Sequence, residues 1–169
     1  MNAKPPRAKD AAAAYREVLA IAPDDLQARK EALNNLAMIL TDMTDPPQAA
    51  DAIKYSQQAY DIVIKAGSDD AIIKDTHAWV LVKIGRTDEA ITLLRGLLDR
   101  QPFPEGFYHL GAAYLQRSQP KKTLEQIEAA NQLIARHNMT IDQELVDKMD
   151  KLSRTAKEMI EMQGTSRVP

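Results

Sequence analysis

The chain has 169 residues, a formal net charge of -2 and no cysteine. This length suffices for one domain with a real core, or for a short repeat array, but not for two ordinary enzyme domains. The lack of cysteine excludes disulfides, thiolate catalysis and cysteine-ligated zinc. The near-balanced charge argues against a nucleic-acid binder, which usually shows a basic face.

The composition favours an all-helical protein. Aromatic residues make up 5% of the chain, glycine is scarce, and alanine, leucine, glutamine and glutamate are frequent. The N-terminus lacks the apolar core of a signal peptide, and no window approaches the run of about 20 apolar residues that spans a bilayer. We therefore expect no direct membrane insertion and a soluble chain, with the choice between cytoplasm and periplasm left open.

Periodicity and helix-ending residues divide the chain into eight expected helices and no strand. Apolar residues recur at three-and-four spacing, interrupted by prolines, glycines and aspartates. Asp24 or Asp25 can cap the second helix, and Thr140 with Gln143 makes a capping box for the last. The expected helices cover residues 9–22, 26–42, 48–65, 71–84, 87–101, 105–117, 121–137 and 140–163, between a disordered lead-in at 1–8 and a disordered tail at 164–169.

Residues 71–103 form the clearest helix-turn-helix unit. Its first helix ends at Gly85, where a left-handed C-cap is wanted. Helices joined by short loops at regular intervals should be tested for internal repetition. Superposing this unit on the next one places Leu81 over Tyr114 and Ala90 over Thr123, both at a spacing of 33 residues.

The repeated pattern resembles the tetratricopeptide repeat (TPR), whose two helices carry large and small apolar residues at fixed positions. Ser56, Lys74 and His77 depart from it, because large apolar residues are expected there. The best-matching repeat carries the pattern through Phe107, Leu110, Gly111, Tyr114, Thr123, Ile127 and Ala130. The resemblance covers residues 9–136, as a half repeat at 9–23 and repeats at about 26–66, 71–103 and 104–137.

This resemblance implies an all-α, TPR-type α-solenoid. It would be a right-handed superhelix of antiparallel helix pairs, about eight helices in all, with residues 140–163 as a C-terminal capping helix. It also implies a non-catalytic scaffold that binds a peptide or helical segment of a partner protein in a concave groove. The expected groove residues are Asn34, Asn35, Met38, Asp75, Thr76, Trp79, Lys83, Tyr108, His109 and Gln116, with Asp42 and Ala112 beside them.

Two of these groove residues have a specific interpretation. In the family, an asparagine at the place of Asn35 hydrogen-bonds the backbone of an extended peptide. Relatives that bind the acidic C-terminal tails of chaperones hold them with a clamp of side chains on neighbouring first helices. The corresponding positions here are occupied by Ile72, Thr76, Glu105 and His109. The clamp is therefore incomplete, and no binding to chaperone tails is expected. For Trp79, the only tryptophan, exposure in the groove and packing against the neighbouring unit are equally open alternatives.

No pattern indicates an enzyme. The chain has no phosphate-binding glycine loop, no nucleophile elbow and no histidine pair at metal-ligand spacing. His77 is expected on a packed face, His109 on the groove side and His137 at a helix end, and Asp69 and Asp70 are more simply helix caps. The sequence therefore predicts no cofactor, no metal and no nucleic-acid partner.

Two alternatives to a peptide-binding scaffold stay open. One is a module that self-associates through its N-terminal edge or through the last helix, whose methionine-bearing stripe could dock a second copy. The other is an accessory domain of a larger protein. Several stretches are similar to the closing repeats of long bacterial TPR arrays, some of them linked to envelope or exopolysaccharide systems: NNLAMIL, DTHAWVLVKIGRTDEAITLL and FYHLGAAYLQ.

Overall fold

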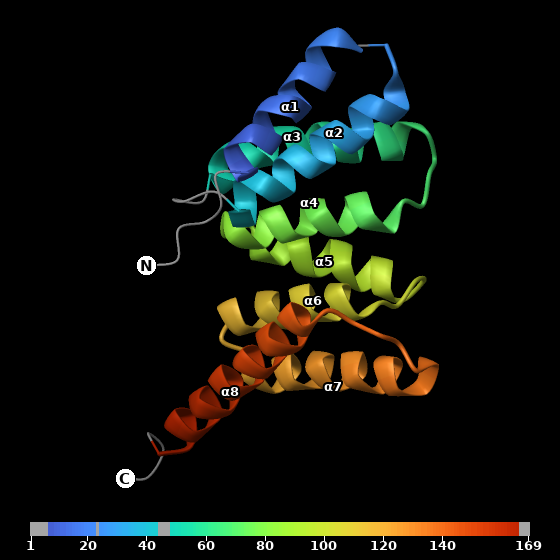
Figure 1. Ribbon diagram of the computed structural model, residues 1–169. Helices are drawn as coiled ribbons and strands as arrows, with labels where there is room; N and C mark the ends of the chain where they lie inside the picture. Colours follow the sequence, from blue (N-terminus) through green and yellow to red (C-terminus); the bar gives the residue numbers. More distant parts are fainter. Residues whose placement is uncertain (1–6, 23, 44–47, 166–169) are drawn as a thin grey trace. The chain divides into compact units, whose positions relative to one another are not determined.

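The computed structural model describes residues 7–22, 24–43 and 48–165, and these ranges are helical without a strand (Figure 1). The expected all-α class is thus confirmed for the described residues. The expected tail beyond residue 165, most of the lead-in and the break at Asp45 to Pro47 lie outside them. The helices are α1 (Arg7–Ile21), α2 (Leu26–Met38), the π-helix η1 (Ile39–Met43), α3 (Ala49–Lys65), α4 (Ala71–Lys83), α5 (Thr87–Leu98), α6 (Pro104–Gln116), α7 (Pro120–His137) and α8 (Gln143–Thr165).

The chain divides into two compact units, residues 1–86 and 87–169, and each is described by itself. In the first, each of the helices α1 to α4 packs against the next, and α2 also contacts α4. In the second, α5 to α8 pack in the same way, and α6 also contacts α8. Within each unit this is a repeat-like arrangement of neighbouring helices. The boundary falls inside the expected repeat 71–103, whose two helices belong to different units.

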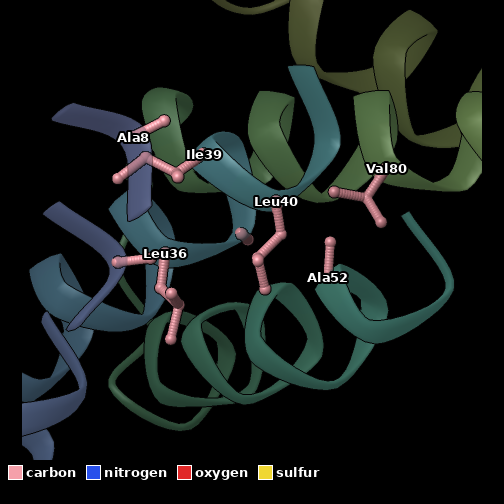
Figure 2. Packing of buried hydrophobic residues seen from close by; sticks show 8 residues of the cluster. Ala8, Leu36, Ile39, Leu40, Ala52 and Val80 are labelled. Carbon is pink, nitrogen blue, oxygen red and sulfur yellow. The ribbon is translucent and has the colours of Figure 1, made fainter. Parts of the chain in front are cut away.

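The core of the first unit forms where α1, α2, η1, α3 and α4 meet. Figure 2 shows Leu36 and Leu40 lying between small or branched side chains of the surrounding helices. Small residues such as Ala52 on α3 let the helices approach closely, and the larger side chains fill the space between them. A second cluster continues this core between α2, α3 and α4 and contains Leu33, Ala59, Val63 and Ile73.

The core of the second unit includes the contact of α7 with α8. Ile127 and Ala130 of α7 pack with Leu145 and Met149 of α8. Thr123 stands where the repeat pattern expects alanine, and its hydroxyl donates a hydrogen bond to the carbonyl of Gly111 at 3.0 Å. The hydroxyl is thereby satisfied although the residue is fully buried.

The residues expected to end or cap helices do so at Gly85 and Asp25 but not at Thr140. Gly85 ends α4 with φ of +83°, a left-handed conformation that glycine adopts without strain. Asp25 caps α2, accepting hydrogen bonds from the backbone amides of its second and third residues, both at 3.0 Å. The predicted capping box of Thr140 with Gln143 is wrong. Asp142 directly precedes α8, and its carboxylate accepts from the Glu144 amide at 2.9 Å.

Other helix boundaries also differ from the expectation. α8 runs to Thr165, past the expected end at residue 163 and into the expected tail 164–169. α1 begins at Arg7, inside the expected lead-in, because Ala8 belongs to the core and is only 4% exposed. The expected helix 26–42 changes to a π-helix at Ile39. There the buried Thr41 hydroxyl donates to the Ala37 carbonyl at 2.7 Å. Such a bond competes with the regular backbone bond to the same carbonyl, which favours a local widening of the helix.

The three departures from the repeat pattern are polar groups that find partners within the first unit. Ser56 Oγ on α3 lies 3.0 Å from Nδ1 of His77 on α4, and both side chains are buried. The ring of Tyr60 stacks on His77 with centroids 4.8 Å apart. Lys74 pairs with Asp69 at 2.6 Å. A polar side chain can therefore replace a large apolar one here, because its hydrogen bonds offset the loss of hydration.

Candidate functional site

A pocket of about 240 Å³ lies between α2 and the start of α4, entirely within the first unit. Positions 27, 30, 31 and 34 contribute from α2, and this spacing of three and four residues places them on one helical face. The remaining positions come from the next turn of α2 and from the start of α4. The lining residues are Gln27, Lys30, Glu31, Asn34, Asn35, Asp70, Ile72 and Ile73.

Asp70 organises the side of the pocket formed by α4. One oxygen of its carboxylate accepts a hydrogen bond from the backbone amide of Ile73 at 3.3 Å, which caps the helix. The other oxygen pairs with Lys30 Nζ of α2 at 2.9 Å. The ion pair links the two helices across the pocket, and both side chains are less than a quarter exposed.

Two adjacent asparagines of α2 line the pocket, and their side chains differ in hydrogen bonding. The Asn35 side-chain nitrogen donates to the hydroxyl of Tyr15 on α1 at 3.1 Å. Asn34 is only 7% exposed, and its Oδ1 has no hydrogen-bond partner among the residues that the structure describes. A buried amide oxygen without a donor costs about 1–3 kcal/mol, so its presence next to a pocket calls for an explanation.

Trp79 belongs to a polar cluster at the other end of α4. Its indole Nε1 donates to Asp42 Oδ2 on η1 at 2.7 Å, and the side chain is 6% exposed. Lys83 Nζ lies 4.5 Å from the centroid of the Trp79 ring and 3.1 Å from Asp42 Oδ1. Of the two alternatives for Trp79, these contacts agree with a packed side chain.

The remaining groove residues expected in the first unit do not reach the pocket. Met38 is half-buried on α2, and Asp75 and Thr76 are buried along α4. Lys83 is more exposed but is engaged with Trp79 and Asp42. Of the seven residues expected in this unit, the structure brings Asn34 and Asn35 together in the pocket.

The three groove residues expected in the second unit lie on α6. The ring of Tyr108 contacts that of His109 with centroids 5.4 Å apart, and His109 is buried. Tyr108 also packs at the edge of the core formed by α7 and α8. Gln116 Oε1 accepts a hydrogen bond from the Thr87 hydroxyl at 2.8 Å. All three side chains therefore have contacts within their own unit.

Sequence reasoning missed six of the eight pocket residues. Gln27, Lys30 and Glu31 could have been found, since they precede Asn34 at helical spacing. The sequence singled out Ile72 only as a position of the clamp for acidic C-termini, and Asp70 only as a helix cap. No sequence pattern indicated that Lys30 and Asp70, 40 positions apart, form an ion pair, because that depends on how α2 packs beside α4.

Comparison with known proteins gives no assignment: no family model matches the chain, and no curated protein matches it in sequence. The protein class shown is therefore an all-α, repeat-like helical protein. Among the described residues, none of the helices combines the length and the apolar character of a membrane-spanning segment. The described residues also contain no cluster of three or more His, Asp or Glu side chains placed to hold a metal ion.

Proposed function

We propose that this protein is a non-catalytic, TPR-type helical scaffold that binds an extended peptide segment of a partner protein, with the pocket between α2 and α4 as its anchoring site. The observation that carries the proposal is the buried Asn34 Oδ1, which lacks a donor among the described residues and belongs to a residue that lines the pocket. Because the oxygen is enclosed, a peptide backbone N–H or a side-chain donor satisfies it when the Asn34 side chain turns toward the pocket.

The size of the pocket favours an extended segment over a helix. Its 240 Å³ lies below the roughly 300–1,000 Å³ typical of small-molecule and cofactor sites. A helix with its side chains is about 10 Å across and needs a long groove. The pocket therefore fits one side chain together with the adjoining backbone of an extended peptide.

The energetics of Asn34 support a binding role over a structural one. A buried polar atom without a partner lowers the stability of the folded state. Proteins retain such groups at sites where function outweighs the loss in stability. Leucine at this position would remove the unsatisfied atom while filling a similar volume, so we expect Asn34→Leu to unfold at the same temperature as the parent chain or higher.

The test is a panel of fluorescently labelled random octapeptide pools, titrated with the full chain and read by fluorescence polarisation. We expect at least one pool to bind the parent chain and to lose about tenfold or more in affinity with Asn34→Leu, as when a buried hydrogen bond worth about 1.5 kcal/mol or more is removed. The matched control is Asn131→Leu at an exposed position of α7, which should bind like the parent.

Two outcomes would count against the proposal. One is that no pool binds the parent chain at all. The other is that pools bind, but with equal affinity to Asn34→Leu, which would move the binding site away from the pocket. Thermal unfolding of each variant, followed by circular dichroism, distinguishes a loss of binding from a loss of folding.

A further inference from the structure

We propose that the pocket between α2 and α4 recognises a basic side chain of the partner peptide, and arginine in particular. This inference rests on the proposed peptide-binding function and deepens it by naming the side chain that enters the pocket. It is carried by the kinds of hydrogen-bonding groups that line the pocket, by their net charge and by the apolar surface at the start of α4.

The lining side chains mainly offer hydrogen-bond acceptors. Asn34 contributes an amide whose Oδ1 is enclosed, so this oxygen meets a ligand once the side chain turns toward the pocket. Asn35 uses its nitrogen to bond Tyr15, so its amide has its oxygen to offer to a ligand. Glu31 adds an exposed carboxylate, one oxygen of which already accepts from the Gln27 side chain. A ligand that satisfies these groups has to bring several N–H donors.

The charges around the pocket favour a cation. Lys30 is the one cation among the lining residues, and Asp70 neutralises it at 2.9 Å. With two carboxylates against one lysine, one negative charge remains, and Glu31 carries it. The N-terminus of α4 adds a partial positive charge of about half a unit. This is less than the full charge of Glu31, so the local balance stays negative.

Ile72 and Ile73 supply the apolar surface that a long basic side chain needs. Ile73 is buried, whereas the Ile72 side chain is 72% exposed at the pocket. Arginine and lysine bury their aliphatic stems on such surfaces while the charged head reaches polar groups. Arginine fits better than lysine, because its planar head carries five donors that can serve several acceptors at once. A carboxylate ligand would instead meet the Asn34 oxygen and the Glu31 charge.

The experiment titrates the isotope-labelled full chain with acetyl-Ala-Arg-Ala-amide and follows amide signals by NMR. We expect shifts of the Asn34 side-chain amide and of the Ile72 and Ile73 backbone amides. The same peptide with citrulline, which keeps the shape but not the charge, should bind about tenfold more weakly, because charge-assisted hydrogen bonds are about twice as strong as neutral ones. A leucine peptide should bind more weakly still.

A pair of matched variants tests whether the charge of Glu31 contributes to binding of the arginine peptide. Glu31 and Glu128 are both exposed glutamates that accept a hydrogen bond from a glutamine four positions away, on α2 and α7 respectively. Glu31→Gln should weaken arginine-peptide binding about threefold, as for an exposed ion pair, and added salt should reduce the difference. Glu128→Gln should leave the affinity unchanged.

The outcomes separate this inference from the proposed function. Equal binding of arginine and citrulline peptides, or equal effects of the two glutamate variants, would overturn the basic-side-chain assignment. Failure of the arginine peptide to shift the Asn34 signal would overturn it as well. If octapeptide pools still bind in a way that depends on Asn34, the peptide-binding function stands without it. If no pool binds either, both are rejected.

Discussion

At the scale of single residues, the hydrogen bond of Trp79 favours one of the two interpretations of its side chain. An indole on the first helix of a repeat could equally contact a ligand or pack inside the protein. The 2.7 Å bond from its Nε1 to Asp42 places the ring against η1. Trp79→Ala would therefore remove a buried aromatic side chain and cost about 3–5 kcal/mol. Such a variant tests packing, and Asn34→Leu is the better probe of binding.

A double-mutant cycle tests the Trp79–Asp42 pair. We expect Trp79→Phe and Asp42→Ala each to lower the free energy of unfolding, with a coupling of about 1.5–3 kcal/mol because the acceptor is charged. Urea unfolding followed by far-ultraviolet circular dichroism measures all four proteins. The control cycle pairs Trp79→Phe with Asp150→Ala, an exposed aspartate of α8, and should be additive within about 0.5 kcal/mol. Additivity of Trp79→Phe with Asp42→Ala would contradict the hydrogen bond.

Ser56 and His77 are a second case at this scale. Each on its own departs from the repeat pattern, since each replaces an expected large apolar residue. Their side chains lie 3.0 Å apart between α3 and α4. A polar residue that departs from the apolar pattern of one helix can therefore be explained by a polar residue on the helix beside it, because a buried donor requires an acceptor.

At the scale of elements, Gly111 lies where α6 closely approaches α7 and α8. A Cβ at Gly111 of α6 would lie 3.3 Å from Leu152 Cδ2 of α8 and 3.5 Å from Gln126 Cβ of α7. These distances leave room for a methyl group after a small adjustment but not for a larger side chain. At Gly96 of α5, a Cβ would meet nothing within 4 Å.

We expect two substitutions at Gly111 to differ in their effect on the free energy of unfolding. Gly111→Ala should change the free energy of unfolding by less than about 1 kcal/mol, because the gain in helix propensity offsets the tighter contact. Gly111→Leu should cost about 1–3 kcal/mol through overpacking. Gly96→Leu is the matched control and should not destabilise the protein. Urea unfolding checks all three, and a Gly111→Leu protein as stable as the parent would disprove the close packing of α6 with α8.

At the scale of the whole molecule, self-association was expected through the N-terminal edge or the last helix, and the second possibility depends on what α8 leaves exposed. Leu145, Met149 and Ala156 are buried, and the first two pack with α7. Met162 is a large apolar side chain of α8 that remains 61% exposed. Single exposed apolar residues are common on monomeric proteins and do not by themselves make an interface.

We therefore expect a monomer. Size-exclusion chromatography with light scattering should give the mass of one chain at a low and at a tenfold higher concentration. A mass that rises toward two chains, and that Met162→Lys returns to one, would favour the assembly module over the peptide-binding scaffold. Lys148→Gln at an exposed position of the same helix is the control and should not change the mass.

Much of the secondary structure was predictable from local chemistry. The helical periodicity, the left-handed Gly85 and the caps at Asp25 and Asp70 depend on residues within a few positions of one another, so the sequence carries their signals. The errors were also local: Asp142, and not Thr140, directly precedes α8, and the Thr41 hydroxyl widens the helix that begins at Leu26.

The candidate site depended on tertiary structure. The sequence predicted Asn34 and Asn35 as groove residues from their position on a first helix. The ion pair of Lys30 with Asp70 arises only where α2 and α4 pack side by side. That Asn34 Oδ1 has no donor among the described residues is likewise a property of the folded chain. Periodicity reports which face of a helix is buried, whereas the satisfaction of each polar atom depends on groups that lie far away in the chain.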